Sequence, residues 1–243
     1  MKNLKIKYRI FLISVIAIAG LLIFSGLQLW DKFQVSREMG SLQELAELGP
    51  EISALVHELQ KERGASAGFI ASEGGKFGEK LRTQRLSTDE MNAALDIALA
   101  AFDTEAYGAG LVDKVSAARA AVAELAAKRT RVSALELTVP EMAGYYTPTI
   151  AQLLGIVEEM AVLSTDAAVS NQITAYTSFL QAKERAGIER AMGAGGFSAG
   201  KFKPAIYRKF LQLIAQQDAL LGVFDNYGTA GQKEFYAATV TGP

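Results

Sequence analysis

The feature that most constrains this chain is a run of 21 residues without a charge. The stretch "IFLISVIAIAGLLIFSGLQLW" (residues 10–30) is almost wholly apolar, and as a helix it is long enough to cross about 30 Å of hydrocarbon. It is too long for the core of a signal peptide, and no cleavage site of small residues follows it. Trp30 stands at its far end, where an interfacial aromatic residue belongs. The sequence therefore predicts a transmembrane helix over residues 10–30.

Charge on the two sides of this run predicts its orientation. Residues 1–9 contain four basic residues and no acid, a pattern that keeps a segment on the cytoplasmic side. We therefore expect a protein of the inner (cell) membrane with a cytoplasmic N-terminus and a periplasmic or extracellular remainder. All 26 acidic but only 21 of the 25 basic residues follow Arg9, so residues 10–243 carry a net charge of −5. Without a strongly basic surface, no nucleic-acid partner is expected.

The remainder of the chain has the composition of an all-helical protein. Half of the residues are hydrophobic and only five are proline, and no alternating strand pattern competes with the helical periodicity. We expect an all-α chain in which one N-terminal transmembrane helix precedes long antiparallel helices packed as bundles. In the first half we expect a helix over 31–49, a break or new first turn at Pro50, a helix to about Ser72, a loop at 73–78 and a helix start at the Ser87–Glu90 capping box. One long helix should follow over 111–137, and a second capping box at Thr138–Glu141. In the last part we expect a helix from Pro148 to about Met192, a glycine break at 193–202, a helix over 204–227 and a weaker helix after it.

Arg63 is the first candidate binding residue, because it interrupts an apolar stripe. On a helical wheel it falls within about 40° of the line through Ile52, Val56, Leu59 and Ile70. A buried guanidinium costs several kcal/mol unless it is paired. Two interpretations stay open. Arg63 can be structural, either in an ion pair with a carboxylate of the bundle or extended outward to solvent. Alternatively, it is held in the core for an anionic ligand.

A second block, "QAKERAGIERAMGAGGFSAGKF" (residues 181–202), repeats the Lys-Glu-Arg opening of "QKERGASAGFI" (residues 60–70). Arg185 and Arg190 are five residues apart, and hence about 140° apart on a helix. They cannot share the centre of one face. Arg190 lies nearer the apolar line, and Lys183, seven residues earlier, shares its side. A solvated helix face is the alternative interpretation of this block.

Several catalytic and cofactor classes lack their motifs. Gly195, Gly200 and Lys201 match GxxxxGK, but Phe202 replaces the Ser or Thr of a phosphate-binding loop and a helix precedes the run instead of a strand. His57 is the only histidine and the chain has no cysteine, so a metal site made of histidine and cysteine ligands cannot be assembled. We expect no enzyme, no catalytic residue, no metal and no cofactor.

Five stretches of the sequence resemble the nitrate- and nitrite-sensing (NIT) domain family. They are "ELQKERGASAGFIAS", "QRLSTD", "YYTPTIAQLLGIVEEMAVLSTD", "ITAYTSFLQAKERAGIERAMGAGGFSAGKF" and "YRKFLQLIAQQDALLGVF". The resemblance covers roughly residues 50–230 and implies an all-helical fold with helices in two bundles. It implies the sensing part of a transmembrane receptor, with a methyl-accepting chemotaxis protein as our expectation and a kinase or a cyclic-nucleotide enzyme as the open alternatives. The domain ranges then expected are a basic head (1–9), a membrane helix (10–30), a juxtamembrane helix (31–49), a NIT-like sensor (50–230) and a segment leading toward a second membrane helix (231–243).

The resemblance also implies a ligand and its residues. It places nitrate or nitrite against arginines of the two blocks, which correspond here to Arg63, Arg185 and Arg190, with Lys183 as a possible addition. A homodimer is likewise implied by the family. We hypothesise that facing arginines repel one another until an anion binds between them and shifts the helices. Two rival hypotheses stay open. The bundle could sense another small anion such as a carboxylate, or it could be a membrane-anchored scaffold with structural arginine salt bridges.

Overall fold

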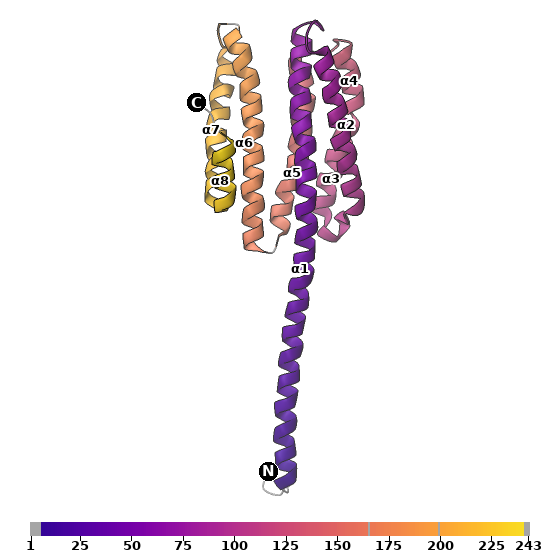
Figure 1. Cartoon of the computed structure of the whole chain (residues 1–243), viewed down its shortest axis with the longest axis vertical. Helices are drawn as coiled ribbons and strands as arrows, with labels where there is room; N and C mark the ends of the chain where they lie inside the picture. Colours follow the sequence, from indigo (N-terminus) through magenta and orange to yellow (C-terminus); the bar gives the residue numbers. More distant parts are fainter. Residues whose placement is uncertain (1–5, 165, 199, 241–243) are drawn as a thin grey trace. The chain divides into compact units, whose positions relative to one another are not determined.

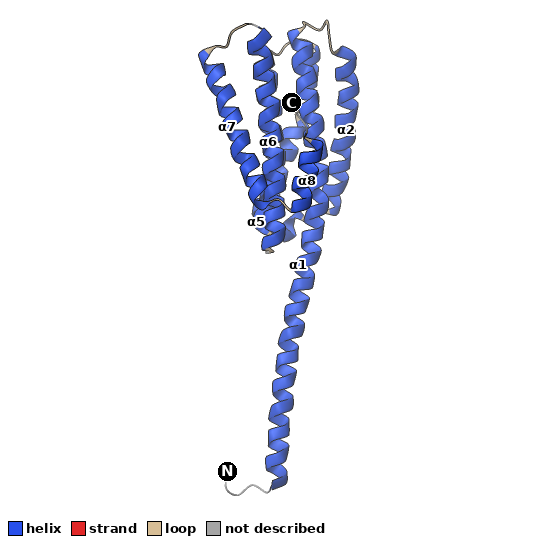
Figure 2. Cartoon of the chain, turned by 60° about the vertical axis from the view of Figure 1, so that its left-hand side comes forward, coloured by secondary structure: helices blue, strands red, loops and turns tan. Residues whose placement is uncertain are grey.

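The computed structural model describes residues 6–164, 166–198 and 200–240. Within these residues every regular element is a helix, as Figure 2 shows, which confirms the all-α prediction. The elements are α1 (Ile6–Ala71), α2 (Gly78–Ala101), the 3-10 turn η1 (Thr104–Tyr107), α3 (Ala109–Ala123), α4 (Leu125–Ser133), α5 (Val139–Leu163), α6 (Ala167–Ser198), α7 (Pro204–Tyr227) and α8 (Ala230–Thr239).

The chain divides into two compact units at residues 44 and 45. In the second unit the helices form two groups (Figure 1). The C-terminal part of α1 lies beside α2, α3, α4 and α5, while α6 lies beside α7 and α8. The α5–α6 hairpin joins the groups. The helices are therefore packed as bundles, as the sequence predicts.

The core of the second unit is formed by apolar residues at helical spacing. Ile52, Leu55 and Leu59 of α1 are fully buried, and so are Ile150 and Leu154 of α5. Each such side chain contributes roughly 1.5–3 kcal/mol by leaving water. This spacing directs one face of α1 inward, and it is the same face that carries Arg63.

Capping decides where α5 and α6 begin. The Thr138–Glu141 capping box is present, with the Thr138 amide donating to Glu141 Oε2 over 2.8 Å. The start predicted at Thr147–Pro148 is wrong, because α5 has already begun at Val139 and continues through Pro148. The predicted helix to Met192 is also interrupted, since α5 ends at Leu163 and α6 begins at Ala167. Asp166 Oδ1 accepts from the amides of Ala168 and Val169 over 2.7 and 3.0 Å and so caps α6.

Three other predicted boundaries are wrong for similar local reasons. Ser87 and Glu90 lie inside α2, which begins at Gly78 after a turn in which Ser72 Oγ accepts from the Lys76 amide over 3.0 Å. The helix predicted over 111–137 is broken at Glu124 into α3 and α4. Pro50 does not end α1, which continues through it to Ala71 although the proline removes a backbone hydrogen bond.

Other predicted boundaries are confirmed. A turn occupies residues 72–77, close to the predicted loop at 73–78, and α7 spans the predicted range 204–227. The glycine-rich break is shorter than predicted, because α6 continues to Ser198. A helix, α8, follows as expected.

In the N-terminal region the structure describes the backbone more fully than the side chains. The helix α1 is continuous from Ile6 through the predicted juxtamembrane segment at 31–49. Residues 1–5 lie outside the described part, and so do the side chains of residues 6–10, 12–14, 16, 17 and 31–46. No helix in the described part of the chain combines the length and the apolar character needed to cross a membrane. This finding does not support the span predicted over residues 10–30.

Candidate anion site and buried arginine clusters

Arg63 lies in the core, as its place in the apolar stripe predicts. The residue is only 8% exposed, although its side chain ends in a full charge. The helix α1 carries it to the junction with α5 and α6. A buried guanidinium needs several acceptors to replace the water that it loses.

The partner of Arg63 is Glu184 of α6. Arg63 Nη1 donates to Glu184 Oε1 over 2.6 Å, and Nη2 donates to Oε2 over 3.1 Å. Nη1 also donates to Thr147 Oγ1 of α5 over 2.8 Å, and Gln60 Nε2 donates to Glu184 Oε2 over 2.9 Å. Glu184 is 2% exposed. The geometry is the two-point fork that arginine forms with carboxylates, so the ion-pair interpretation of Arg63 describes what the structure contains.

Gly187 lies beside this pair. It lies three residues after Glu184 on the same face of α6, and a Cβ there would stand 3.4 Å from Arg63 Nη2. The guanidinium therefore lies within van der Waals reach of this position of α6. The second sequence block thus meets the first through Glu184 and Gly187 rather than through its arginines.

The three basic residues predicted from the second block have different surroundings on α6. Arg185 is half-buried and donates to Gln181 of its own helix. Arg190 is exposed. Lys183 Nζ lies 3.0 Å from His57 Nδ1 of α1. The structure therefore brings Lys183 to α1 beside the Arg63 region, and it records no contact that joins Arg185 or Arg190 to Arg63.

The positive charge of Lys183 affects the protonation of His57. Burial lowers the pKa of His57 below its usual 6.5, and the neighbouring positive charge of Lys183 lowers it further. Burial also lowers the pKa of Lys183, against the opposing charges of Glu184 and Glu58. Two proton-binding groups in contact disfavour double protonation. The imidazole is therefore neutral at pH 7 and can accept a hydrogen bond from the ammonium group.

We expect His57 to titrate below pH 6.5 in the folded chain. Between this lowered pKa and 6.5 the unfolded chain binds more protons, so stability increases with pH through that window and is lost as pH falls through 6.5. The effect is small, under about 0.5 kcal/mol, because solvent screens a half-exposed pair. Since His57 is the only histidine, its imidazole NMR signals give the midpoint directly. Lys183→Gln should raise the midpoint more than the control Lys61→Gln, and a wild-type midpoint at or above 6.5 would contradict the expectation.

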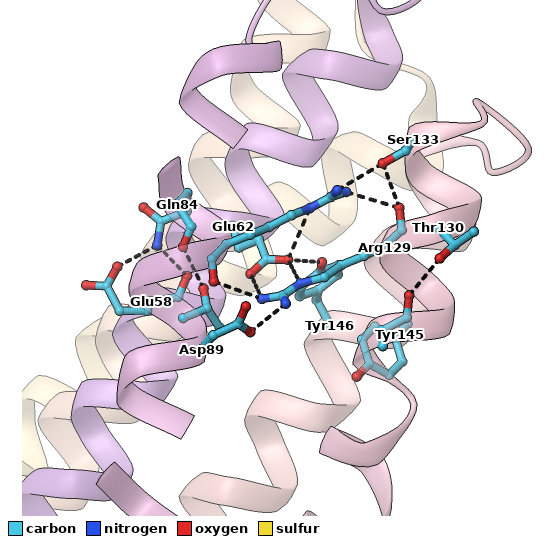
Figure 3. Close-up of polar contacts among 12 residues, drawn as sticks. Glu58, Glu62, Gln84, Asp89, Arg129, Thr130, Ser133, Tyr145 and Tyr146 are labelled. Atoms are coloured by element: carbon cyan, nitrogen blue, oxygen red, sulfur yellow. Dashed lines mark hydrogen bonds and ion pairs between the residues drawn. The ribbon is translucent and has the colours of Figure 1, made fainter. Parts of the chain in front are cut away.

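A second buried cluster surrounds Glu62, the neighbour of Arg63 on α1. In Figure 3 the Glu62 carboxylate lies between Arg129 of α4 and Tyr146 of α5. Arg129 Nε donates to Glu62 Oε1 over 2.7 Å and Nη2 to Oε2 over 2.8 Å, while the Tyr146 hydroxyl donates to Oε1 over 2.8 Å. Glu62 has no exposed surface. Its charge is therefore satisfied wholly by protein groups.

Two further charged residues of α2 complete this cluster, which we call the Glu62 cluster (Glu62, Arg85, Asp89, Arg129 and Tyr146). Arg129 Nη1 donates to Asp89 Oδ1 over 2.5 Å. Arg85 Nε lies 3.9 Å from Glu62 Oε1, and its Nη2 donates to the Arg129 carbonyl over 3.1 Å. With two arginines and two carboxylates, the Glu62 cluster is neutral as a whole.

The pKa shifts in the Glu62 cluster follow from this arrangement. Burial alone would lower the pKa of Arg129, but hydrogen bonds and charges of Glu62 and Asp89 outweigh it and raise the pKa. Burial lowers the pKa of Arg85, against the attraction of Glu62. Burial raises the pKa of Tyr146, and the adjacent Glu62 charge raises it further. Both arginines stay charged and the phenol stays protonated at physiological pH, so the phenol is a permanent donor to Glu62.

Sequence reasoning missed the Glu62 cluster and Glu184. Glu62 and Glu184 each stand directly before the arginine in a Lys-Glu-Arg triplet, but a carboxylate next to arginine on a helix is most often a solvated residue. The helical wheel offered a signal for Glu62, since it lies about 100° from Arg63 and so faces a different neighbour. Among the described residues, no group of His, Cys, Asp and Glu has the arrangement of a metal site.

The fold and these two clusters define a helical bundle domain with guanidinium groups buried between its helices. Residues 54–243 match the family model described as nitrate and nitrite sensing. The chain therefore belongs to the nitrate and nitrite sensing (NIT) family, which confirms the family predicted from the sequence motifs.

Two similar proteins add to this assignment. The nitrate regulatory protein of Klebsiella oxytoca is 32% identical over 196 residues, which are 81% of this chain and 48% of that protein. A solved structure of the NasR transcription antiterminator is 31% identical, with a TM-score of 0.79 over 89% of this chain and 60% of that one. The chain thus spans about half the length of the curated relative. Neither name describes a chemotaxis receptor, the type that we expected.

Proposed function

We propose that this chain is the ligand-binding part of a signalling protein that senses nitrate or nitrite. The anion would bind where α1 meets α6, at Arg63, with Lys183, Arg185 and Arg190 of the second block as further ligands. The observation that carries the proposal is the buried guanidinium of Arg63 at the junction of three helices in a chain of the NIT family.

The chemistry of nitrate suits this position. Nitrate is planar and has three acceptor oxygens, and arginine offers a planar fork of donors that stays charged when buried. Charge-assisted hydrogen bonds contribute about 1.5–3 kcal/mol each. Two or three of them, less the cost of ordering, reach about −8 kcal/mol, which corresponds to a micromolar Kd.

We also propose that α1 carries the signal and attaches the chain to a membrane. It is one continuous helix from Ile6 to Ala71, so a shift at Arg63 can be transmitted along its length. The uncharged run at residues 10–30 supports the attachment, and its described large apolar side chains stay exposed, with Phe24 at 62% and Trp30 at 66%. The periplasmic or extracellular placement of the sensor, the homodimer and chemotaxis as the output belong to the same proposal.

One rival function has support from a specific observation. Glu184 satisfies the guanidinium of Arg63, and Arg129 satisfies Glu62, as expected for a helical scaffold held by structural salt bridges. A scaffold binds no small anion. A sensor of small carboxylates is the other rival, because Arg63 already binds a carboxylate in this structure.

The experiment is a thermal-shift titration of the full 243-residue chain in detergent with nitrate, nitrite, chloride, sulfate and acetate at constant ionic strength. A ligand that binds only the folded chain raises Tm, and at 100 times Kd it adds about 2.7 kcal/mol to the free energy of unfolding. We expect this response for nitrate or nitrite, and we expect it to weaken in Arg190→Gln and Arg185→Gln. The control Arg82→Gln, which removes an exposed arginine of α2, should respond as wild type. A flat response to every anion would favour the scaffold.

A further inference from the structure

We infer that Glu184 is an internal competitor for the anion site. Its carboxylate occupies the guanidinium of Arg63, and an external anion binds there by displacing it. The inference rests on the proposed function, since it names the regulation of the same site. It concerns an acidic residue of the second block that the sequence analysis did not predict as a site residue.

The first support is the completeness of the Arg63–Glu184 pair. Both terminal nitrogens of Arg63 donate to Glu184, at 2.6 and 3.1 Å, and both residues are buried. Thr147 Oγ1 takes a further bond from Nη1. The fork of Nη1 and Nη2 is therefore already in use. An anion can form the two-point contact with this fork only after the carboxylate has moved.

The second support is chemical similarity. A carboxylate and a nitrate are both planar, with pairs of oxygens that match the guanidinium fork. Glu184 therefore presents to Arg63 the same surface that nitrate would present. A side chain tethered beside its partner acts at an effective concentration of about millimolar or more. We expect the pair to weaken the apparent affinity for nitrate about 10- to 100-fold.

The third support is that the displaced carboxylate retains a partner. Gln60 Nε2 donates to Glu184 Oε2 over 2.9 Å without the help of Arg63. Gln60 precedes Arg63 by three residues and hence by almost one turn of α1. Glu184 can therefore leave the guanidinium without losing every hydrogen bond in a buried place.

Displacement also couples the ligand to helix packing. The Arg63–Glu184 pair joins α1 to α6, and these helices belong to the two groups of the second unit. An anion that takes over Arg63 removes this link. A ligand that binds better to one of the two arrangements shifts their populations, which is the requirement for a signal.

The test compares the full-length wild-type chain with Glu184→Gln, by isothermal titration and thermal shift with nitrate and with formate, a small planar carboxylate. We expect Glu184→Gln to bind nitrate 10- to 100-fold more tightly and to acquire formate binding. Glu62→Gln is the matched control, since it also neutralises a buried glutamate of a salt bridge, and its nitrate affinity should equal that of wild type. Glu184→Asp, whose side chain is one methylene shorter, should give an intermediate gain in nitrate affinity. It replaces Glu184→Gln in the test if that variant does not fold.

The outcomes separate the inference from the proposed function. A wild-type chain that binds nitrate, with Kd unchanged in Glu184→Gln or Glu184→Asp, would overturn the inference and leave the sensor function standing. In a second outcome, the wild-type chain binds no anion but Glu184→Gln binds nitrate or formate. This result would support Glu184 as a competitor and would contradict nitrate sensing by the wild-type chain. If neither variant nor wild type binds an anion, Arg63 is not an anion site and the inference fails with it.

Discussion

Replacement of Arg129 by methionine is expected to lower the free energy of unfolding by about 3–5 kcal/mol. The change removes both direct ion-pair contacts to Glu62, which has no exposed surface, and leaves the carboxylate with the Tyr146 hydroxyl and a distant Arg85 Nε at 3.9 Å. An uncompensated buried charge is among the costliest defects in a protein interior. Urea unfolding followed by circular dichroism measures the loss.

Two further variants test the cause of this loss. Arg131→Met on the same helix removes a half-exposed arginine that lies 3.6 Å from Glu136, and it should cost under about 0.5 kcal/mol. The double variant Arg129→Met/Glu62→Gln should recover part of the stability, because the buried charge is gone. A double variant as unstable as the sum of its singles would show that packing, rather than the uncompensated charge, explains the effect.

Arg63→Met is expected to cost about 3 kcal/mol and to loosen α6 in particular. The change leaves the Glu184 carboxylate, 2% exposed, with Gln60 as its remaining donor. It also removes a polar link between α1 and α6. Hydrogen exchange followed by mass spectrometry should show faster exchange of amides in α6 than in α2, in addition to a lower midpoint of urea unfolding.

The matched control for this change is Lys61→Met, two residues away on α1. Lys61 is half-exposed and contacts Glu58 of its own helix over 2.8 Å, so its loss should be nearly neutral. Equal destabilisation by both variants would argue against a special role for the buried pair. Uniform acceleration of exchange over all helices of Arg63→Met would mean that the link does not hold α6 specifically.

Much of the helical architecture could be predicted because its signals are local. The 3.6-residue periodicity of apolar side chains indicates helices wherever it occurs, and the Thr138–Glu141 box marks a start that the structure confirms. The same locality explains the errors. Thr147–Pro148 and Ser87–Glu90 carry the features of helix starts, yet both lie inside helices whose buried faces continue past them. Local preferences of about 1 kcal/mol do not outweigh the burial of a whole face.

The candidate site was predicted in part for a related reason. Arg63 interrupts the apolar stripe of its own helix, so its burial could be predicted from α1 alone. Its partner could not, because Glu184 follows 121 residues later and only the packing of α6 against α1 brings the two together. The Glu62 cluster depends in the same way on α2, α4 and α5 meeting at one level of α1.

The sequence by itself determined the helical class, the NIT family and the position of a buried arginine, because periodicity and motifs are properties of neighbouring residues. Only the tertiary structure decided which carboxylate each arginine meets. Charge–charge energies in a protein interior depend on separations of a few ångströms, and such separations between distant segments are set by how whole helices pack.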